Sequence, residues 1–138
     1  MEIVRFLKFF AVGMVFFISL DFVWINLIMN KGYKTYLKPI ARKKNGELTL
    51  NLFTSLLVWM LIVFGMLIFV YPKIEISNGL ESFLWGGIYG FIVYGIYDLT
   101  NYSILEHWPL ALALIDIGWG TFANGALAYV FYLLRKLI

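Results

Sequence analysis

The chain has 138 residues, of which 62% are hydrophobic, 20% aromatic and only 14% charged, with a net charge of +3. A soluble globule of this size buries only about two-thirds of the surface of its unfolded chain, so the excess apolar side chains would face water and aggregate. A soluble domain and a disordered chain are therefore excluded, and the absence of cysteine excludes a disulfide scaffold. We expect an integral membrane protein.

Four apolar stretches are long enough to cross a hydrocarbon core, which takes roughly 20 helical residues. They cover residues 6–28, 48–71, 83–102 and 108–134. Because backbone groups in lipid must be satisfied within their own segment, we expect all four to be helices. Pro72 predicts the end of the second span, and Pro109 the start of the fourth. The chain should form one domain, an all-α integral membrane four-helix bundle with its N and C termini on the same side.

The bundle then has two sides, which we name by what they carry. The terminal side carries both termini, and the loop side carries residues 29–47 and the short loop around Glu106. The 11 Lys and Arg residues divide five to six between the two sides, which gives no clear orientation bias. The density of positive charge in residues 29–47 favours a cytoplasmic loop side. We expect a multi-pass protein of the cell (inner) membrane.

The loop at residues 29–47 is strongly basic. Its positive residues are Lys31, Lys34, Lys38, Arg42, Lys43 and Lys44. Interleaved tyrosines invite a nucleic-acid interpretation, but lysines beside a membrane attract anionic lipid headgroups by about 1 kcal/mol each. We therefore expect contacts with anionic headgroups and none with nucleic acid. The spacing of Tyr33, Tyr36, Leu37 and Ile40 predicts a short segment lying on the interface.

The acidic residues separate by type. All five glutamates lie outside the spans or at their ends, whereas all three aspartates, Asp21, Asp98 and Asp116, lie inside them. An aspartate near the centre of a membrane helix costs about 2.5–3.5 kcal/mol on insertion scales, so three of them need a reason. At 1.5 Å per residue, all three lie roughly 6–12 Å below the loop-side face. The second span adds Asn51 and Ser55 at matching depth.

Helical spacing places each aspartate on a face that also carries glycine and an aromatic or amide side chain. The predicted ligand-binding residues on these helices are Asp21, Trp24, Asn51, Ser55, Tyr94, Asp98, Asn101, Asp116, Trp119 and Asn124. Glycine lets helices approach closely, so we expect the aspartate faces to pack inward and to bring the carboxylates together.

Converging carboxylates would need a partner for their charge. No Lys or Arg lies in the loop-side half of any span. The group would therefore retain protons or bind a cation, while indole and phenol donors such as Trp24, Trp119 and Tyr94 stabilise one remaining carboxylate. Asp21, Asp98 and Asp116 are thus the candidate ligands of a divalent cation. Oxygen ligands favour Mg²⁺, Ca²⁺ or Mn²⁺ over zinc.

Three functions fit this pattern. The first is binding of a cation, a proton or a small polar molecule at the one-sided carboxylate site, with transport coupled to it. The terminal-side half of the spans is nearly free of ionisable residues, so a continuous polar channel does not fit. The small size of the chain and the nearly even division of Lys and Arg between its two sides would suit a homodimeric carrier. The second is a membrane-embedded, metal-dependent enzyme acting on a lipid. The third is a purely structural or assembly role.

Three motifs also suggest a family. They are Leu20-Asp21-x-x-Trp24, Tyr97-Asp98-Leu99-Thr100-Asn101 and Asp116-x-x-Trp119-Gly120. In this order, in a four-span chain of this length, they resemble the bacterial family of predicted membrane proteins called domain of unknown function 2177. The resemblance covers nearly the whole chain. It implies a bacterial-type four-helix membrane protein whose signature residues are the three aspartates and their companions, and it implies no particular activity.

Overall fold

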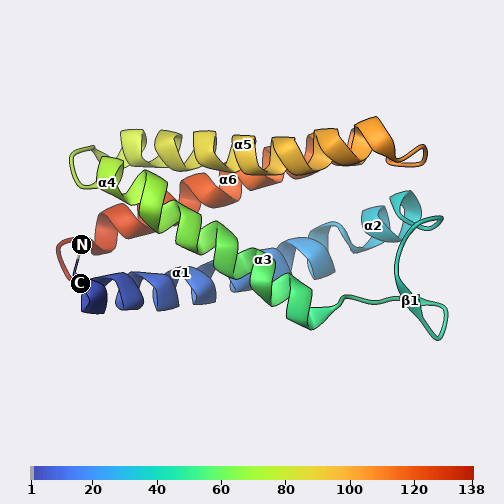
Figure 1. Ribbon diagram of the computed structural model, residues 1–138, viewed down its shortest axis with the longest axis horizontal. Coiled ribbons are helices and arrows are strands. Elements are labelled where there is room, and N and C mark those ends of the chain that lie inside the picture. Colours follow the sequence, from blue (N-terminus) through green and yellow to red (C-terminus); the bar gives the residue numbers. More distant parts are fainter. Residues whose placement is uncertain (1) are drawn as a thin grey trace.

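The computed structural model describes residues 2–138, and this part of the chain is helical almost throughout (Figure 1). The first span is α1 (Ile3–Val23), which continues directly into the π-helical turn η1 (Trp24–Ile28). The short helix α2 (Asn30–Tyr36) follows and ends before Pro39. A π turn widens the helix and changes the direction of the side chains that follow it. Here that turn begins at Trp24, one of the predicted site residues.

A small hairpin connects α2 to the second span. Strand β1 (Lys43–Lys44) pairs antiparallel with β2 (Glu47–Leu48), and Lys44 lies opposite Glu47. The connecting residues Asn45 and Gly46 have φ angles of 53° and 81°. Asn-Gly favours such a two-residue turn because both positions need a positive φ. The hairpin is too short to change the all-α class of the fold.

The second span is one continuous helical stretch made of α3 (Leu52–Gly65), the π-helical η2 (Met66–Val70) and α4 (Tyr71–Ile74). The sequence predicted its end at residue 71, before Pro72. The helix instead continues to Ile74, because Pro72 lies in the first turn of α4, directly after the π turn, where the missing N–H costs little.

The last two helices form a long antiparallel pair. They are α5 (Gly79–Ile104) and α6 (Leu110–Leu134). A capping box starts α5: the Glu81 N–H donates to Asn78 Oδ1 at 2.9 Å, and the Asn78 N–H donates back to Glu81 Oε2 at 3.1 Å. The helix therefore begins four residues before the predicted residue 83.

Within residues 2–138, three helical stretches are long and apolar enough to cross a membrane. They are Ile3–Ile28, Leu52–Ile74 and Leu110–Leu134. Their outward side chains are largely exposed, among them Leu27, Leu61 and Phe69. Exposed apolar surface of this extent on three long helices is what a lipid environment accommodates.

Glycine sets the close approach of α5 and α6. A Cβ atom added at Gly90 would meet the backbone carbonyl oxygen of Gly120, and one at Gly86 would meet that of Asn124. The two helices can therefore touch along this line only because these positions lack side chains. The end of α5 and the start of α6 therefore lie at the same end of the bundle (Figure 1). Asp98 belongs to the last two turns of α5 and Asp116 to the first two turns of α6.

The tightly packed core lies in the terminal-side half. Phe9, Phe17, Val63, Met66 and Phe131 are completely buried there. Both termini lie at this end (Figure 1), as predicted. The Arg5 guanidinium joins them to the rest of the bundle, since it pairs with Glu75 at 3.1 Å and donates to the Arg135 carbonyl oxygen.

The bundle is looser toward the loop side. Helix α3 crosses α1 diagonally, and its first two turns extend away from the other helices (Figure 1). In residues 52–58 of α3, only Ser55 is not exposed. Two of the predicted site residues, Asn51 and Ser55, lie at this outward end of α3.

Candidate functional site

Asp21 lies near the point where α1, α3 and α6 meet. Its side chain is 7% exposed. Each carboxylate oxygen accepts a hydrogen bond from an indole: Trp59 Nε1 lies 2.7 Å from Oδ2, and Trp119 Nε1 lies 2.9 Å from Oδ1. Two N–H donors on a buried carboxylate offset part of the cost of removing its charge from water. Asp21 is thus anchored by the second and fourth spans.

Asp116 on α6 is held by the loop. The Tyr33 hydroxyl on α2 donates to Asp116 Oδ1 at 2.7 Å, and Trp24 Nε1 donates to the same hydroxyl at 3.1 Å. Tyr33 lies outside the spans. Its burial, together with the negative charge of Asp116 and the hydrogen bond to it, raises the pKa of Tyr33 well above its ordinary value of 10.0. The phenol therefore remains a donor across the physiological pH range.

Two tryptophans connect the aspartates. The rings of Trp24 and Trp119 stack with centroids 4.3 Å apart and planes 4° from parallel. Trp119 donates to Asp21, and Trp24 donates to the tyrosine that holds Asp116. We call this arrangement the carboxylate network, which consists of Asp21, Trp24, Tyr33, Trp59, Asp116 and Trp119.

Asp98 has one donor close by, the Trp108 indole N–H, but no hydrogen bond of good geometry joins the two within residues 2–138. Asp98 is completely buried, and neither carboxylate oxygen has a hydrogen-bond partner within residues 2–138. The Trp108 indole N–H, which lies beside it, is also buried and unpartnered in this part of the chain. A buried carboxyl group without a donor is costly when charged, so it needs a proton, a water molecule or a ligand.

Asp116 lies between the other two aspartates electrostatically: its charge affects Asp98, and the charge of Asp21 affects Asp116. The Tyr94 hydroxyl lies near enough to feel the charge of all three. The two ion pairs found among the described residues, Arg5–Glu75 and Lys34–Glu47, involve none of these aspartates. Three carboxyl groups therefore share one end of the bundle with no cationic side chain paired to them.

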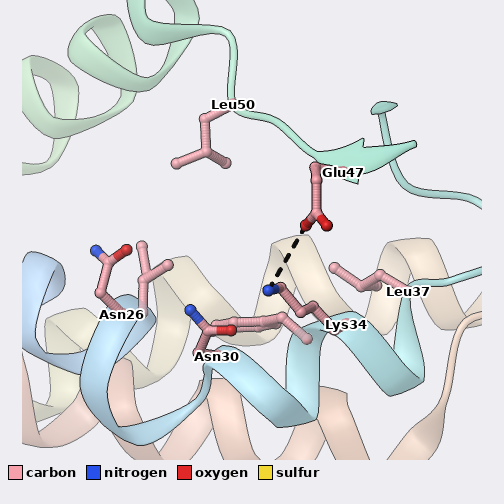
Figure 2. A pocket seen from close by; sticks show the side chains of 8 residues that line it. Asn26, Asn30, Lys34, Leu37, Glu47 and Leu50 are labelled. Atoms are coloured by element: carbon pink, nitrogen blue, oxygen red, sulfur yellow. Dashed lines mark ion pairs between the residues drawn. The ribbon is translucent and has the colours of Figure 1, made fainter. Parts of the chain in front are cut away.

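A pocket of about 350 Å³ lies beside the network at the loop side. It is bounded by η1, by α2 and by residues 47–50, and Tyr33 forms part of its wall. Figure 2 shows Lys34 reaching across it to Glu47, with Nζ 3.7 Å from Oε2. We call it the interfacial pocket. The Tyr33 hydroxyl also contacts Asp116, so this side chain connects the wall of the pocket to the carboxylate network.

A protein-family model described as "Predicted membrane protein" (domain of unknown function 2177) matches residues 6–133. The chain belongs to this family. No curated protein and no solved structure matches the chain. Family membership and the apolar helices together make it an integral membrane protein of the family to which its motifs pointed.

In this family member, Asn51 and Ser55 lie apart from the carboxylate network. Asn51 is exposed and forms the N-cap of α3, where its Oδ1 accepts the Thr54 N–H at 3.3 Å. Ser55 lies in the following turn and is half-buried. Asparagine directly before an apolar helix is a common capping signal, which explains the position of Asn51 without a ligand.

Asn124, Tyr94 and Asn101 lie around the network rather than in it. Asn124 is completely buried, and its Nδ2 donates to the Gly120 carbonyl oxygen at 2.8 Å, about 12 Å along α6 from Asp116 at 1.5 Å per residue. Tyr94 packs its ring against Gly120. Asn101 is half-buried, one turn after Asp98. Asn124 and Tyr94 therefore serve the contact between α5 and α6.

This arrangement does not support the prediction that the three aspartates together bind a divalent cation. Within the part of the chain that the structure describes, no three His, Cys, Asp or Glu side chains lie close enough to hold a metal ion together. Asp21 has both oxygens occupied by indole donors, and Asp116 has one occupied by Tyr33.

Two network residues were not predicted. Trp59 lies in the part of the second span that the sequence assigned to the apolar half, yet its indole reaches Asp21 because α3 crosses α1 near this point. Tyr33 was placed on the membrane surface, although its hydroxyl reaches Asp116 on α6. A lone tryptophan within an apolar span was the signal for Trp59, because a buried indole N–H needs an acceptor.

Proposed function

We propose that this membrane protein binds a cation or a proton at the three loop-side aspartates. The observation that carries this proposal is the grouping of Asp21, Asp98 and Asp116 around one end of the bundle without a paired lysine or arginine among the described residues. Like charges in a low-dielectric interior disfavour joint ionisation, so a proton or a cation stabilises the group.

The binding groups are the carboxylate oxygens that no donor occupies. No hydrogen bond of good geometry reaches either oxygen of Asp98 within residues 2–138, and Tyr33 contacts Asp116 through Oδ1. Asp21 is saturated by Trp59 and Trp119. Asp98 and Asp116 therefore take the ion, and Asp21 adds negative potential. A divalent ion would complete its shell with water.

The route to this site passes Tyr33. The residue lines the interfacial pocket and contacts Asp116, so displacement of its hydroxyl opens the carboxylates to the loop side. The terminal-side core of Phe9, Phe17 and Phe131 closes the opposite direction. Transport would therefore require movement of helices, whereas binding alone requires only movement of Tyr33.

The membrane arrangement that we propose has four spans in the cell (inner) membrane. Helix α5 is the fourth span, since its 26 residues reach about 39 Å at 1.5 Å per residue. The exposed basic side chains of residues 31–44 lie at the loop side, where they attract anionic headgroups. A homodimer would suit a carrier of this small size.

Tryptophan fluorescence in lipid nanodiscs tests the binding site. Of the five tryptophans, Trp24, Trp59 and Trp119 belong to the network, and Trp108 lies beside Asp98. We expect the emission to change as protons or cations are titrated, and Asp116→Asn and Asp98→Asn to shift or abolish the change. Glu106→Gln, an exposed acid, is the matched control. Wild-type titration in both aspartate variants would refute the proposal.

Proteoliposomes separate binding from transport. Uptake that is driven by a pH gradient and abolished by Asp98→Asn supports a carrier. Lipid turnover without uptake would support the enzyme hypothesis instead. If the three single Asp→Asn variants fold, bind and grow as the wild type does, the aspartates serve only helix association.

A further inference from the structure

The interfacial pocket lies where a phospholipid headgroup would lie. It is built at the loop-side end of the first span, from η1, α2 and residues 47–50. Its apolar wall consists of Ile25, Leu37 and Leu50, and the neighbouring Leu27 and Ile28 are 74% and 60% exposed. A volume of about 350 Å³ is within the usual range for sites that bind small molecules. The apolar surface continues from the pocket to the lipid-facing side of the helix.

Two opposite charges face each other across this pocket. Lys34 Nζ and Glu47 Oε2 are 3.7 Å apart, and the side chains are 54% and 79% exposed (Figure 2). An exposed pair at this distance contributes little, about 0–1 kcal/mol, so a ligand can exchange with it. Asn26 and Asn30 add amide groups to the lining of the pocket. The pocket therefore offers one cation, one anion and neutral polar groups beside an apolar surface.

We propose that the interfacial pocket binds a phospholipid whose headgroup is zwitterionic phosphoethanolamine. Lys34 pairs with the phosphate and Glu47 with the ammonium group, while Ile25, Leu37 and Leu50 contact the glycerol and the start of the acyl chains. A primary ammonium donates hydrogen bonds to a carboxylate, which a quaternary ammonium lacks the hydrogens to do. The apolar surface next to the pocket favours a lipid over a water-soluble phosphoethanolamine ester.

This proposal differs from the attraction of anionic lipid to the basic loop. Diffuse attraction grows with negative charge, so it would favour phosphatidylglycerol over phosphatidylethanolamine. A site with Glu47 opposite Lys34 has the reverse preference. The lipid site uses Lys34 and Glu47, whereas the cation site uses the aspartates. The two sites share the wall formed by Tyr33, which also lies on the route that we propose for the cation.

Native mass spectrometry of the full-length protein measures the preference. The ligands are phosphatidylethanolamine, phosphatidylcholine, phosphatidylglycerol and the water-soluble glycerophosphoethanolamine. We expect phosphatidylethanolamine to bind at least about tenfold more tightly than phosphatidylcholine and phosphatidylglycerol, as one additional charged contact predicts. It should also bind more tightly than glycerophosphoethanolamine, which lacks the acyl chains that contact the apolar wall.

Three substitutions test which side chains contribute to this affinity. Lys34→Ala should weaken all the phosphate ligands by about tenfold, because each loses its cation. Glu47→Gln preserves the shape of the side chain and should weaken only the two ligands with a primary ammonium, so that the preference for phosphatidylethanolamine over phosphatidylcholine disappears. Lys31→Ala, one turn earlier on α2 and outside the pocket lining, is the matched control and should bind as the wild type does.

Three results would overturn the proposal. They are a wild type that prefers phosphatidylglycerol, a Lys34→Ala variant with unchanged affinity, and a soluble ester that binds as tightly as the lipid. Thermal unfolding of Lys34→Ala and Glu47→Gln shows whether each variant is folded. The fluorescence titration of the wild type is measured separately, so failure of this proposal is distinguished from failure of the cation site.

Discussion

The Tyr33 hydroxyl donates a hydrogen bond to Asp116 at 2.7 Å although the two residues are 83 positions apart in the chain. One residue lies on a short loop helix and the other on the last long helix. The bond closes the interfacial pocket at its inner wall and occupies one oxygen of an aspartate that no cationic side chain among the described residues pairs with. A single phenol therefore joins the loop to the bundle.

We predict that Tyr33→Phe destabilises the protein by about 1–2 kcal/mol, because Asp116 and Trp24 each lose a hydrogen-bond partner. Thermal unfolding in detergent would measure the loss, and Trp24 emission should change at the same time. Tyr36→Phe on the same helix is the control and should leave both readings unchanged. Equal effects of the two substitutions would show that the Tyr33 hydroxyl contributes nothing specific.

The same pair predicts how stability depends on pH. Since the folded protein raises the pKa of Tyr33 above 10.0, it holds this proton more tightly than the unfolded chain does. The resulting stabilisation is complete below pH 10.0 and declines as the pH rises beyond it. The difference in unfolding temperature between the wild type and Tyr33→Phe should therefore narrow in alkaline buffer. A constant difference to about pH 11 would contradict the prediction.

The residues of the carboxylate network also show which contacts can be predicted from the sequence and which cannot. The depth of the three aspartates and the inward position of Trp119 follow from helical period, which fixes what lies on one face of one helix. Which helices cross, and where, does not follow from period. Trp59 reaches Asp21 through the diagonal crossing of α3, and Tyr33 reaches Asp116 through the path of the loop. Both contacts required three-dimensional structure.

Asn51 illustrates a different limit of the sequence. Its depth matched that of the aspartates, so the sequence grouped it with them. The structure uses it to cap α3. A polar residue at the first turn of a helix has a local partner available, and a local hydrogen bond needs no ligand. Position along the membrane normal therefore identifies site residues well only inside a helix, where local backbone partners are already occupied.

Asp21 should show strong coupling to its two indole donors. Asp21→Asn leaves one acceptor oxygen for two N–H groups and should cost about 1–3 kcal/mol. In a double-mutant cycle, Trp119→Phe should cost less in the Asp21→Asn background than in the wild type, with a coupling of about 1 kcal/mol. Reversible unfolding in mixed detergent micelles gives both values. Additive effects would mean that the hydrogen bond between Asp21 and Trp119 makes no measurable contribution to stability.

The contact between α5 and α6 gives a prediction with an internal control. Gly90→Ala places a methyl group against the Gly120 carbonyl oxygen, so the helices must separate at a cost of about 1–3 kcal/mol. Gly95→Ala lies five residues later on α5, where an added Cβ meets no atom within 4 Å. It should be neutral or slightly stabilising, because alanine is the better helix former. Equal unfolding temperatures for the two variants would contradict this packing.

Asp98 should show a conflict between stability and function. Its carboxyl group is completely buried and has no hydrogen-bond partner within residues 2–138, so an apolar side chain of similar size removes an uncompensated cost. We predict that Asp98→Leu raises the unfolding temperature and at the same time abolishes the tryptophan response to cations or protons. Leu99→Asn, an exposed position on the same helix, controls for the general effect of changing polarity in a span.

A destabilised Asp98→Leu variant would instead indicate that the carboxyl group is held by water or by a bound ion in the folded protein, since loss of an occupied partner is costly. A stabilised variant with an intact response would remove Asp98 from the binding site and leave Asp116 alone to carry it.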